Sequence, residues 1–331
     1  MRRVIGISAG VSVLIGLLIT AFVWPSSQIE PREVPVVVAG PAPAVAEVEA
    51  QLHEAAPGAF DVEAVTDAPA ARQAIEDREA YGAVVLDASG PPRILTASAA
   101  SPAVATALQG IAAQMATQGE GALSVEDVVP LPAEDPRGIG FNSGALPMVM
   151  GGLAAGVVVA LTVTGLRRRF YSATLAAAGG GVVAALVMHS WLGVLDGSWW
   201  AEAGAFTLAI AAVSFTVLSL QALVGRAGLG LAAFVVMLLG NPLSGVTSAP
   251  EMLPSGWGAL GQALPPGAGG SLLRSVAFCD GAGAGEPVLV RSLWIAGALL
   301  AAAVGAAVAG RRERRVAVSD ETTNQAVPVD H

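Results

Sequence analysis

The chain has 331 residues, of which 54% are hydrophobic and only 13% are charged, and its mean hydropathy is +0.64. Soluble globular proteins carry about 25% charged residues, so this composition excludes an ordinary soluble domain and indicates a membrane protein. The formal net charge is -9, which argues against a nucleic-acid partner. The acidity is concentrated between Pro25 and Asn142, where 17 acidic residues stand against 5 arginines.

The basic and metal-binding residue types exclude several kinds of enzyme. All 17 basic residues are arginines, so the chain lacks the lysine that a P-loop or a Schiff-base enzyme requires. Cys279 is the only cysteine, which excludes a disulfide within the chain. The three histidines are widely separated, and we therefore predict no metal site.

The N-terminal residues have the pattern of a membrane helix. Arg2 and Arg3 precede an apolar run over residues 4–23. A cleaved signal peptide has a shorter apolar core, of about 7–15 residues, and a small-residue cleavage site. We therefore expect residues 1–24 to form an uncleaved first transmembrane helix, with a cleaved signal peptide as the alternative.

Residues 25–142 read as a small α/β domain, because segments with strand and helix patterns alternate along them. Asp67 is placed to cap a helix, and Pro102 follows Ser101 at the first turn of another. Residues 119–141 are rich in Gly, Pro and acids, and we expect a loop that returns to the membrane. The expected strands are 34–39, 60–65, 81–86 and 93–97, and the expected helices are 44–56, 67–80 and 101–118.

Residues 143–310 are predicted to form a membrane domain of five helices. Residues 311–331 would then be a cytoplasmic tail. The fold class is thus a polytopic α-helical membrane protein of about six spans, with the α/β domain between spans 1 and 2. The five expected helices are 146–166, 171–195, 203–224, 227–239 with a continuation to about 245, and 292–310.

Arginines predict the orientation of these helices. Positive residues near helix ends mark the cytoplasmic side. Six spans with both termini inside place 10 of the 17 arginines on that side, and leave the acidic domain on the other. We expect a multi-pass protein of the bacterial inner membrane with an extracytoplasmic domain. The 10 arginines are Arg2, Arg3, Arg167, Arg168, Arg169, Arg226, Arg311, Arg312, Arg314 and Arg315.

Two features inside the expected spans have a structural and a functional interpretation. His189 is an ionisable residue within an expected span, and such a residue suggests a functional site. A neutral imidazole bonded to a neighbouring helix or to interfacial water is favoured instead, because no Asp, Glu or Arg accompanies it within any expected span. The spacing of Gly152 and Gly156 predicts close helix packing.

The segment of residues 242–274 reads PLSGVTSAPEMLPSGWGALGQALPPGAGGSLLR. A proline at its start ends the fifth helix after Asn241, because proline lacks a backbone donor. The rest is too interrupted to span a membrane and too apolar for a free loop. We expect short re-entrant or interfacial helices, since irregular backbone at that depth must be buried in protein or line a wet cavity. A long surface loop is the alternative.

This segment resembles the loop that joins the last two membrane helices of ABC-2 type transporter permeases. The resemblance extends to the layout of one helix, a large outer domain and five helices. The residues 80–85 and 97–102 are also similar to the outer domain of the YhgE/Pip-like branch of that superfamily. The matching positions of the segment are Gly245, Pro250, Leu253-Pro254 with Trp257, Pro265-Pro266 and Arg274.

The resemblance implies a permease-like transmembrane subunit of an ABC-2 exporter. A separate ABC ATPase subunit would hydrolyse ATP, and the chain would form a homodimer, or a heterodimer with another permease, within membrane lipid. The chain itself is expected to be no enzyme, and no catalytic, cofactor or metal residues are proposed. The expected gating residues are Asn241, Pro242, Gly245, Pro250, Pro254, Trp257, Pro265, Pro266 and Arg274.

Two further expectations concern side chains of this segment. Trp257 is expected to anchor at the membrane interface. Arg274 is expected to pair with Glu251 or Asp280, or to remain solvated, because exposed pairs are weak. The alternative function is a non-transporting membrane protein whose outer domain binds an envelope component or a partner protein. A membrane enzyme is disfavoured by the lack of an acid-base or metal cluster.

Overall fold

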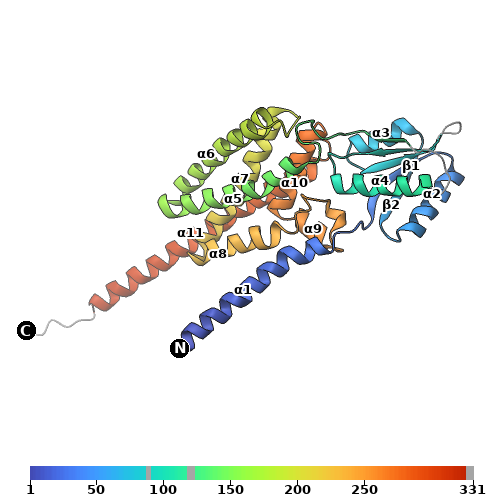
Figure 1. The fold of residues 1–331 in the computed structure, drawn as a ribbon. Coiled ribbons are helices and arrows are strands. Elements are labelled where there is room, and N and C mark those ends of the chain that lie inside the picture. The colour runs from blue at the N-terminus through green and yellow to red at the C-terminus, as the bar shows by residue number, and fades with distance from the viewer. Residues whose placement is uncertain (87–90, 118–123, 326–331) are drawn as a thin grey trace, which may run out of the picture.

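A small α/β domain lies at one end of a helical bundle in the computed structural model, which describes residues 1–86, 91–117 and 124–325. The N-terminus and the end of the last helix lie at the opposite end of the bundle (Figure 1). Five of its helices are long and apolar enough to cross a membrane. The protein is therefore a polytopic helical membrane protein. These helices are α1 (Arg2–Ser27), α5 (Ile139–Thr162), α6 (Leu166–Ala185) with its π-helical continuation η1 (Leu186–Trp191), α7 (Trp199–Val224) and the first part of α11 (Gly285–Gln325).

The fifth expected span is shorter than a bilayer requires. Helix α8 (Ala227–Ala233) continues as the π-helical η2 (Phe234–Gly240), and the pair ends at Asn241 and Pro242. At a rise of about 1.5 Å per residue the two together extend roughly 20 Å, whereas the hydrocarbon core is about 30 Å thick. The prediction of six continuous spans is therefore not confirmed.

Helix α11 extends further than the expected last span. It continues to Gln325, through most of the expected tail of residues 311–331, and residues 326–331 lie outside the described part of the chain.

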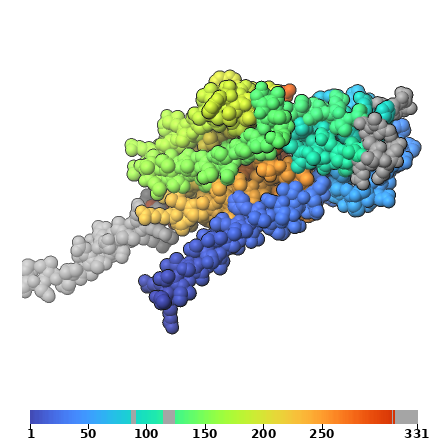
Figure 2. Space-filling view, viewed as in Figure 1, coloured from blue at the N-terminus to red at the C-terminus, as the bar shows by residue number. Residues whose placement is uncertain are grey.

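Helix α1 stands apart from the rest of the molecule. Pro25, near its end, is the only buried residue of the helix. Figure 2 shows α1 as a dark blue rod that diverges from the bundle toward the N-terminus. Its apolar side chains are exposed all round, as expected of a helix in contact with lipid.

Five strands between Val34 and Asp127 form one sheet among the described residues, with the order β2-β1-β3-β4-β5. Strand β1 is parallel to both β2 and β3, β4 is antiparallel to β3, and β5 is parallel to β4. The prediction of alternating strands and helices is confirmed in outline. The elements are β1 (Val34–Ala39), α2 (Ala42–Ala55), β2 (Phe60–Val65), α3 (Ala68–Glu76), β3 (Gly82–Val85), β4 (Arg93–Thr96), α4 (Pro102–Thr117) and β5 (Ser124–Asp127).

The segment 119–141 is not only a loop, as the sequence had suggested. It contains the edge strand β5, and α5 begins within it at Ile139. All four residues of β5 are exposed, so the strand lacks the apolar alternation that would reveal it. Residues 118–123 lie outside the described part of the chain.

Residues from much later in the chain complete the core of this domain. Helix α3 covers one face of the sheet, and that cluster includes Cys279. On the opposite face, α4 packs on the sheet in a cluster that includes Ala249 and Met252. Helix α2 packs beside it. The domain and the region around residues 242–281 therefore share buried surface.

Helix α7 is the centre of the bundle, since it packs against α5, α6, α8, α10 (Pro265–Phe278) and α11. The glycines of α5 allow close approach, as their spacing predicted. A Cβ atom at Gly152 would lie 2.8 Å from the Val213 Cβ atom, and one at Gly156 would lie 2.7 Å from that of Val217. Helix α5 can therefore pack this closely on α7 only with glycine at these positions.

We expect the substitution Gly152→Leu to destabilise the bundle, because its side chain would enter the contact between α5 and α7. Overpacking of this kind costs about 1–3 kcal/mol. The matched control is Gly151→Leu, since a Cβ atom at Gly151 would meet nothing within 4 Å. The measurement is the midpoint of thermal unfolding in detergent micelles. Equal midpoints for the two variants would show that α5 and α7 do not pack in this way.

Candidate functional site

The segment of residues 242–274, which we call the broken segment, folds into short helices. These are η3 (Pro250–Met252), α9 (Trp257–Gln262) and most of α10. Pro265 and Pro266 open α10, where a helix needs no backbone donor. Most of α10 is buried, and it packs against α7 and α11. The broken segment thus turns back into the bundle.

The first candidate gating residues line a small cavity. Asn241, Pro242 and Gly245 surround a space of about 210 Å³ together with residues of α1 and α5. Gly245 has a φ of +66°, and a Cβ atom there would lie 2.9 Å from the Pro250 nitrogen. Glycine is therefore required at this turn. The buried Oδ1 atom of Asn142, on the α5 side of the cavity, has no hydrogen-bond partner among the described residues.

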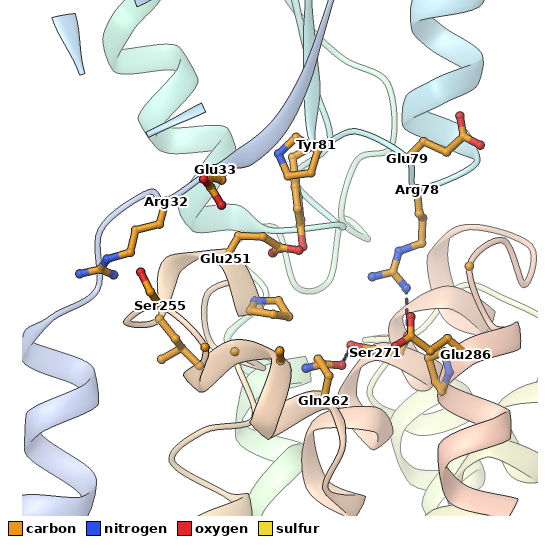
Figure 3. A pocket seen from close by; sticks show the side chains of 18 of the residues that line it. Arg32, Glu33, Arg78, Glu79, Tyr81, Glu251, Ser255, Gln262, Ser271 and Glu286 are labelled. Carbon is orange, nitrogen blue, oxygen red and sulfur yellow. Dashed lines mark hydrogen bonds between the residues drawn. The ribbon is translucent and has the colours of Figure 1, made fainter. Parts of the chain in front are cut away.

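A larger cavity, of about 630 Å³, lies between the α/β domain and the broken segment. We call this contact region the junction. Figure 3 shows side chains from both parts around the cavity. Pro250 and Pro254 belong to its lining, but the groups that can bind a ligand come mainly from residues that the sequence did not single out. They are Arg78, Tyr81, Glu251, Gln262 and Ser271.

Tyr81 and Glu251 join the two sides of this cavity. The Tyr81 hydroxyl donates a hydrogen bond of 2.8 Å to Glu251 Oε2. Burial, followed by the charge of Glu251, raises the pKa of Tyr81 well above its ordinary value. The phenol therefore stays protonated at physiological pH and holds the Glu251 carboxylate in one position.

Arg78 is held in an unusual backbone conformation at the same cavity. Its φ is +63°, a region that residues with a side chain seldom adopt. Its Nη1 donates to the Ser271 carbonyl oxygen at 2.9 Å and also to the Ser275 hydroxyl. A residue other than glycine in the left-handed region costs free energy, and it keeps this conformation only where the surrounding contacts hold it.

Arg274 is neither solvated nor paired with Glu251 or Asp280, and both expectations for it are wrong. It is 5% exposed and donates to the carbonyl oxygens of Ala99 at 2.7 Å and Val246 at 2.8 Å. Its guanidinium also lies 4.7 Å from the centre of the Phe141 ring, which favours a cation there. Arg274 therefore connects the α/β domain, the broken segment and α5.

Trp257 packs against the end of the first helix. Its ring meets that of Trp24 edge to face, with centroids 5.6 Å apart. The side chain is only partly covered, at 37% exposed for the residue. This aromatic pair contributes about 0.5–1.5 kcal/mol beyond the buried area. Trp257 thus holds the end of α1, which also contacts η2.

His189 has a carboxylate partner, contrary to the reasoning from sequence. Its Nδ1 lies 2.9 Å from Glu202 Oε2, and the Gly197 N–H donates to the other carboxylate oxygen at 2.9 Å. Glu202 is fully buried in the first turn of α7 instead of lying in a loop. His189 does bond to a neighbouring helix, but through an acid, and it lies in a π-helical turn of the kind that recurs at functional positions.

Arg291 is a buried cation that the sequence analysis missed. It is 1% exposed, and its Nη2 donates to the Pro265 carbonyl oxygen at 3.0 Å. Its Nε and Nη1 atoms have no hydrogen-bond partner among the described residues. It therefore fastens the first turn of α10 to α11. Only its position in an apolar span could have drawn attention to it.

The candidate gating residues do not form one site. They are divided between the small cavity, the junction, the contact with α1 and the buried helix α10. Within the described residues no three His, Cys, Asp or Glu side chains are placed to hold a metal ion. Comparisons of the chain with protein-family models, with curated proteins and with solved structures gave no match.

Proposed function

We propose that this chain is the permease-like transmembrane subunit of an ABC-2 type exporter. The observation that carries the proposal is the path of the broken segment, whose helix α10 returns into the bundle and packs on α7 and α11. Irregular backbone at membrane depth is tolerated against protein or a water-filled cavity, and a transport path requires such a place. The segment also carries the residues on which the resemblance to ABC-2 permeases rests.

The proposed orientation places the α/β domain outside the cytoplasm of a bacterial cell, with the chain in the inner membrane. Its support is that the N-terminus, the end of α11 and the starts of α6 and α8 lie at the end of the bundle away from that domain (Figure 1). The starts of α6 and α8 carry arginines, among them Arg168 and Arg226. Arginine-rich helix ends favour the cytoplasmic side.

The proposed partners are an ABC ATPase subunit and a second permease, identical or related, in membrane lipid. The chain has no lysine and so cannot form a P-loop of its own, which assigns ATP hydrolysis to another subunit. The ATPase would bind at the arginine-rich end. There Arg169 donates to Gln221 at 2.7 Å and joins α6 to α7.

Co-expression of the chain with the ABC ATPases of its own genome tests the proposal. We expect the chain and one of these ATPases to co-purify and to hydrolyse ATP in nanodiscs. Trp257→Ala removes the contact with Trp24, and Pro254→Ala loosens the turn before α9, so each is expected to lower ATP turnover several-fold while the complex stays intact. The matched control is Trp200→Ala, since Trp200 is 77% exposed. Failure of any ATPase to associate would refute the transporter proposal.

A non-transporting binding protein is the second candidate. The cavity at the junction favours it, because a cavity of about 630 Å³ has the size of a small-molecule site. In this case the α/β domain would bind an envelope component or a partner protein. An intact chain that associates with no ATPase, but binds a ligand at the junction, would support this candidate.

A further inference from the structure

Two of the charged residues that line the cavity at the junction, Arg78 and Glu251, carry opposite charges and are held apart by hydrogen bonds to other residues. The other charged residues of the lining are Arg32, Glu33, Glu79 and Glu286. Figure 3 shows the Glu251 carboxylate on one side and the Arg78 guanidinium on the other, with open space between them. The hydrogen bonds and ion pairs of the described residues include none that joins the two.

Each charge is anchored by hydrogen bonding to the opposite side of the junction. Tyr81 holds Glu251 through one carboxylate oxygen, and the serines at 271 and 275 hold Arg78 through one nitrogen. Among the described residues, nothing bonds to the other carboxylate oxygen of Glu251 or to the remaining guanidinium nitrogens of Arg78, and none of these atoms is buried. They are therefore available to the cavity. Such anchoring is the arrangement that a pre-organised binding site requires.

The space between these groups suits a small polar molecule. Its volume of about 630 Å³ lies within the range of ordinary small-molecule sites. Gln262 and Ser271 line it as well, and both lie in the broken segment. A ligand with only one charge would leave the opposite group without a partner in a partly desolvated place, which costs free energy.

We propose that the cavity binds a small zwitterion, whose cationic group contacts Glu251 and whose anionic group contacts Arg78. The ligand carries an ammonium together with a carboxylate or a phosphate, and it comes from a soluble amino-acid derivative or from a lipid head group. Because Arg78 belongs to the α/β domain and Glu251 to the broken segment, the ligand bridges the junction and holds its two sides together. This inference does not depend on the chain being a transporter.

Cys279 provides a reporter for such bridging. It is 8% exposed, and it packs in the core cluster that α3 and the sheet form at the junction. Burial raises the pKa of its thiol, so Cys279 reacts slowly with a maleimide while it stays packed in this cluster. A ligand that bridges the junction therefore slows labelling of Cys279 further.

The experiment uses the full chain in nanodiscs of uncharged lipid. The probes are glycylglycine, N-acetylglycine as the anion-only analogue, glycinamide as the cation-only analogue, and O-phosphoethanolamine. Binding is measured by calorimetry and by the rate of Cys279 labelling. We expect one or both zwitterions to bind at least tenfold more tightly than the single-charge analogues and to slow labelling. Preference for O-phosphoethanolamine identifies a lipid head group as the source, and preference for glycylglycine identifies a soluble ligand.

Three variants separate this site from a merely structural role. Glu251→Gln keeps a group that can accept the Tyr81 hydrogen bond, and Arg78→Gln removes the cation, so each is expected to weaken zwitterion binding at least tenfold. If Arg78→Gln does not fold, Arg78→Lys replaces it. Lysine keeps the positive charge but loses the planar guanidinium that can bind a carboxylate or phosphate through two hydrogen bonds, so weaker binding is still expected. The matched control is Glu76→Gln, because Glu76 is exposed on α3 and does not line the cavity.

The proposal is overturned by any of three results. The first is that the single-charge analogues bind as tightly as the zwitterions. The second is that the folded Glu251→Gln protein binds the zwitterions with unchanged affinity. The third is that none of the probes binds or protects Cys279. The last result leaves the proposed function untouched, because association with an ATPase is measured separately.

Discussion

The substitution Arg274→Met is expected to lower the free energy of unfolding by on the order of 3–5 kcal/mol. Arg274 donates two buried hydrogen bonds, to the carbonyl oxygens of Ala99 and Val246. Hydrogen bonds that involve a charged group contribute about 1.5–3 kcal/mol each, and a buried acceptor that loses its donor keeps its desolvation cost. Methionine fills much of the same volume against Phe141, so the loss arises chiefly from the unsatisfied carbonyls.

The unfolding midpoint in detergent micelles measures this loss, and the labelling rate of Cys279 shows where the protein opens. Arg274→Met should expose Cys279 at a lower temperature, because Arg274 joins the α/β domain to the broken segment. The control is Arg72→Met. Arg72 pairs with Glu126 on the surface, where an ion pair contributes about 0–1 kcal/mol. Similar midpoints for the two variants would contradict the role of Arg274.

The substitution Glu202→Leu is expected to cost on the order of 3 kcal/mol. Glu202 is fully buried, and it accepts from the Gly197 N–H and pairs with His189. Leucine would leave the His189 imidazole and the Gly197 N–H without this acceptor, and because both partners are only partly buried each loss costs about 1–2 kcal/mol. The effect should appear as faster proteolysis near residues 191–198, where α6 meets α7.

A graded series identifies the cause of this effect. Glu202→Gln keeps a carbonyl that accepts from Gly197, so it should retain most of the stability that Glu202→Leu loses. Glu47→Leu, on the exposed face of α2, is the control for loss of an acid as such. If Glu202→Gln is as unstable as Glu202→Leu, then the negative charge, and not the hydrogen bonding, is what the site needs.

Most elements of the fold could be predicted because their apolar residues follow a regular period. The apolar run of β1 and the alternation in β2 gave strands at the observed residues, and Asp67 caps α3 through the Ala70 N–H as expected. Strand β5 could not be predicted, since its residues are all exposed at the edge of the sheet. The break in the fifth helix was foreseen from Pro242, but the shortness of α8 and η2 was not.

The contacts that build the candidate site lie beyond a reading of the sequence. Arg274 bonds to backbone carbonyls, which every residue carries, so no acidic side chain in the sequence reveals its partners. Tyr81 and Glu251 are separated by 170 positions. Glu202 was missed because the helix start was placed one residue beyond it. Prolines and glycines located the broken segment, whereas the charges that surround its cavity became visible only with the fold.

The shared core of the α/β domain imposes an order of events on synthesis of the protein. The last strand of the sheet ends at Asp127, but Ala249, Met252 and Cys279, which close its two faces, leave the ribosome more than a hundred residues later. At about 5–20 residues per second, the nascent domain waits on the order of ten seconds or more with apolar surface uncovered. A chaperone or the insertion machinery has its opportunity to bind in that interval, and truncation before residue 249 should prolong the association.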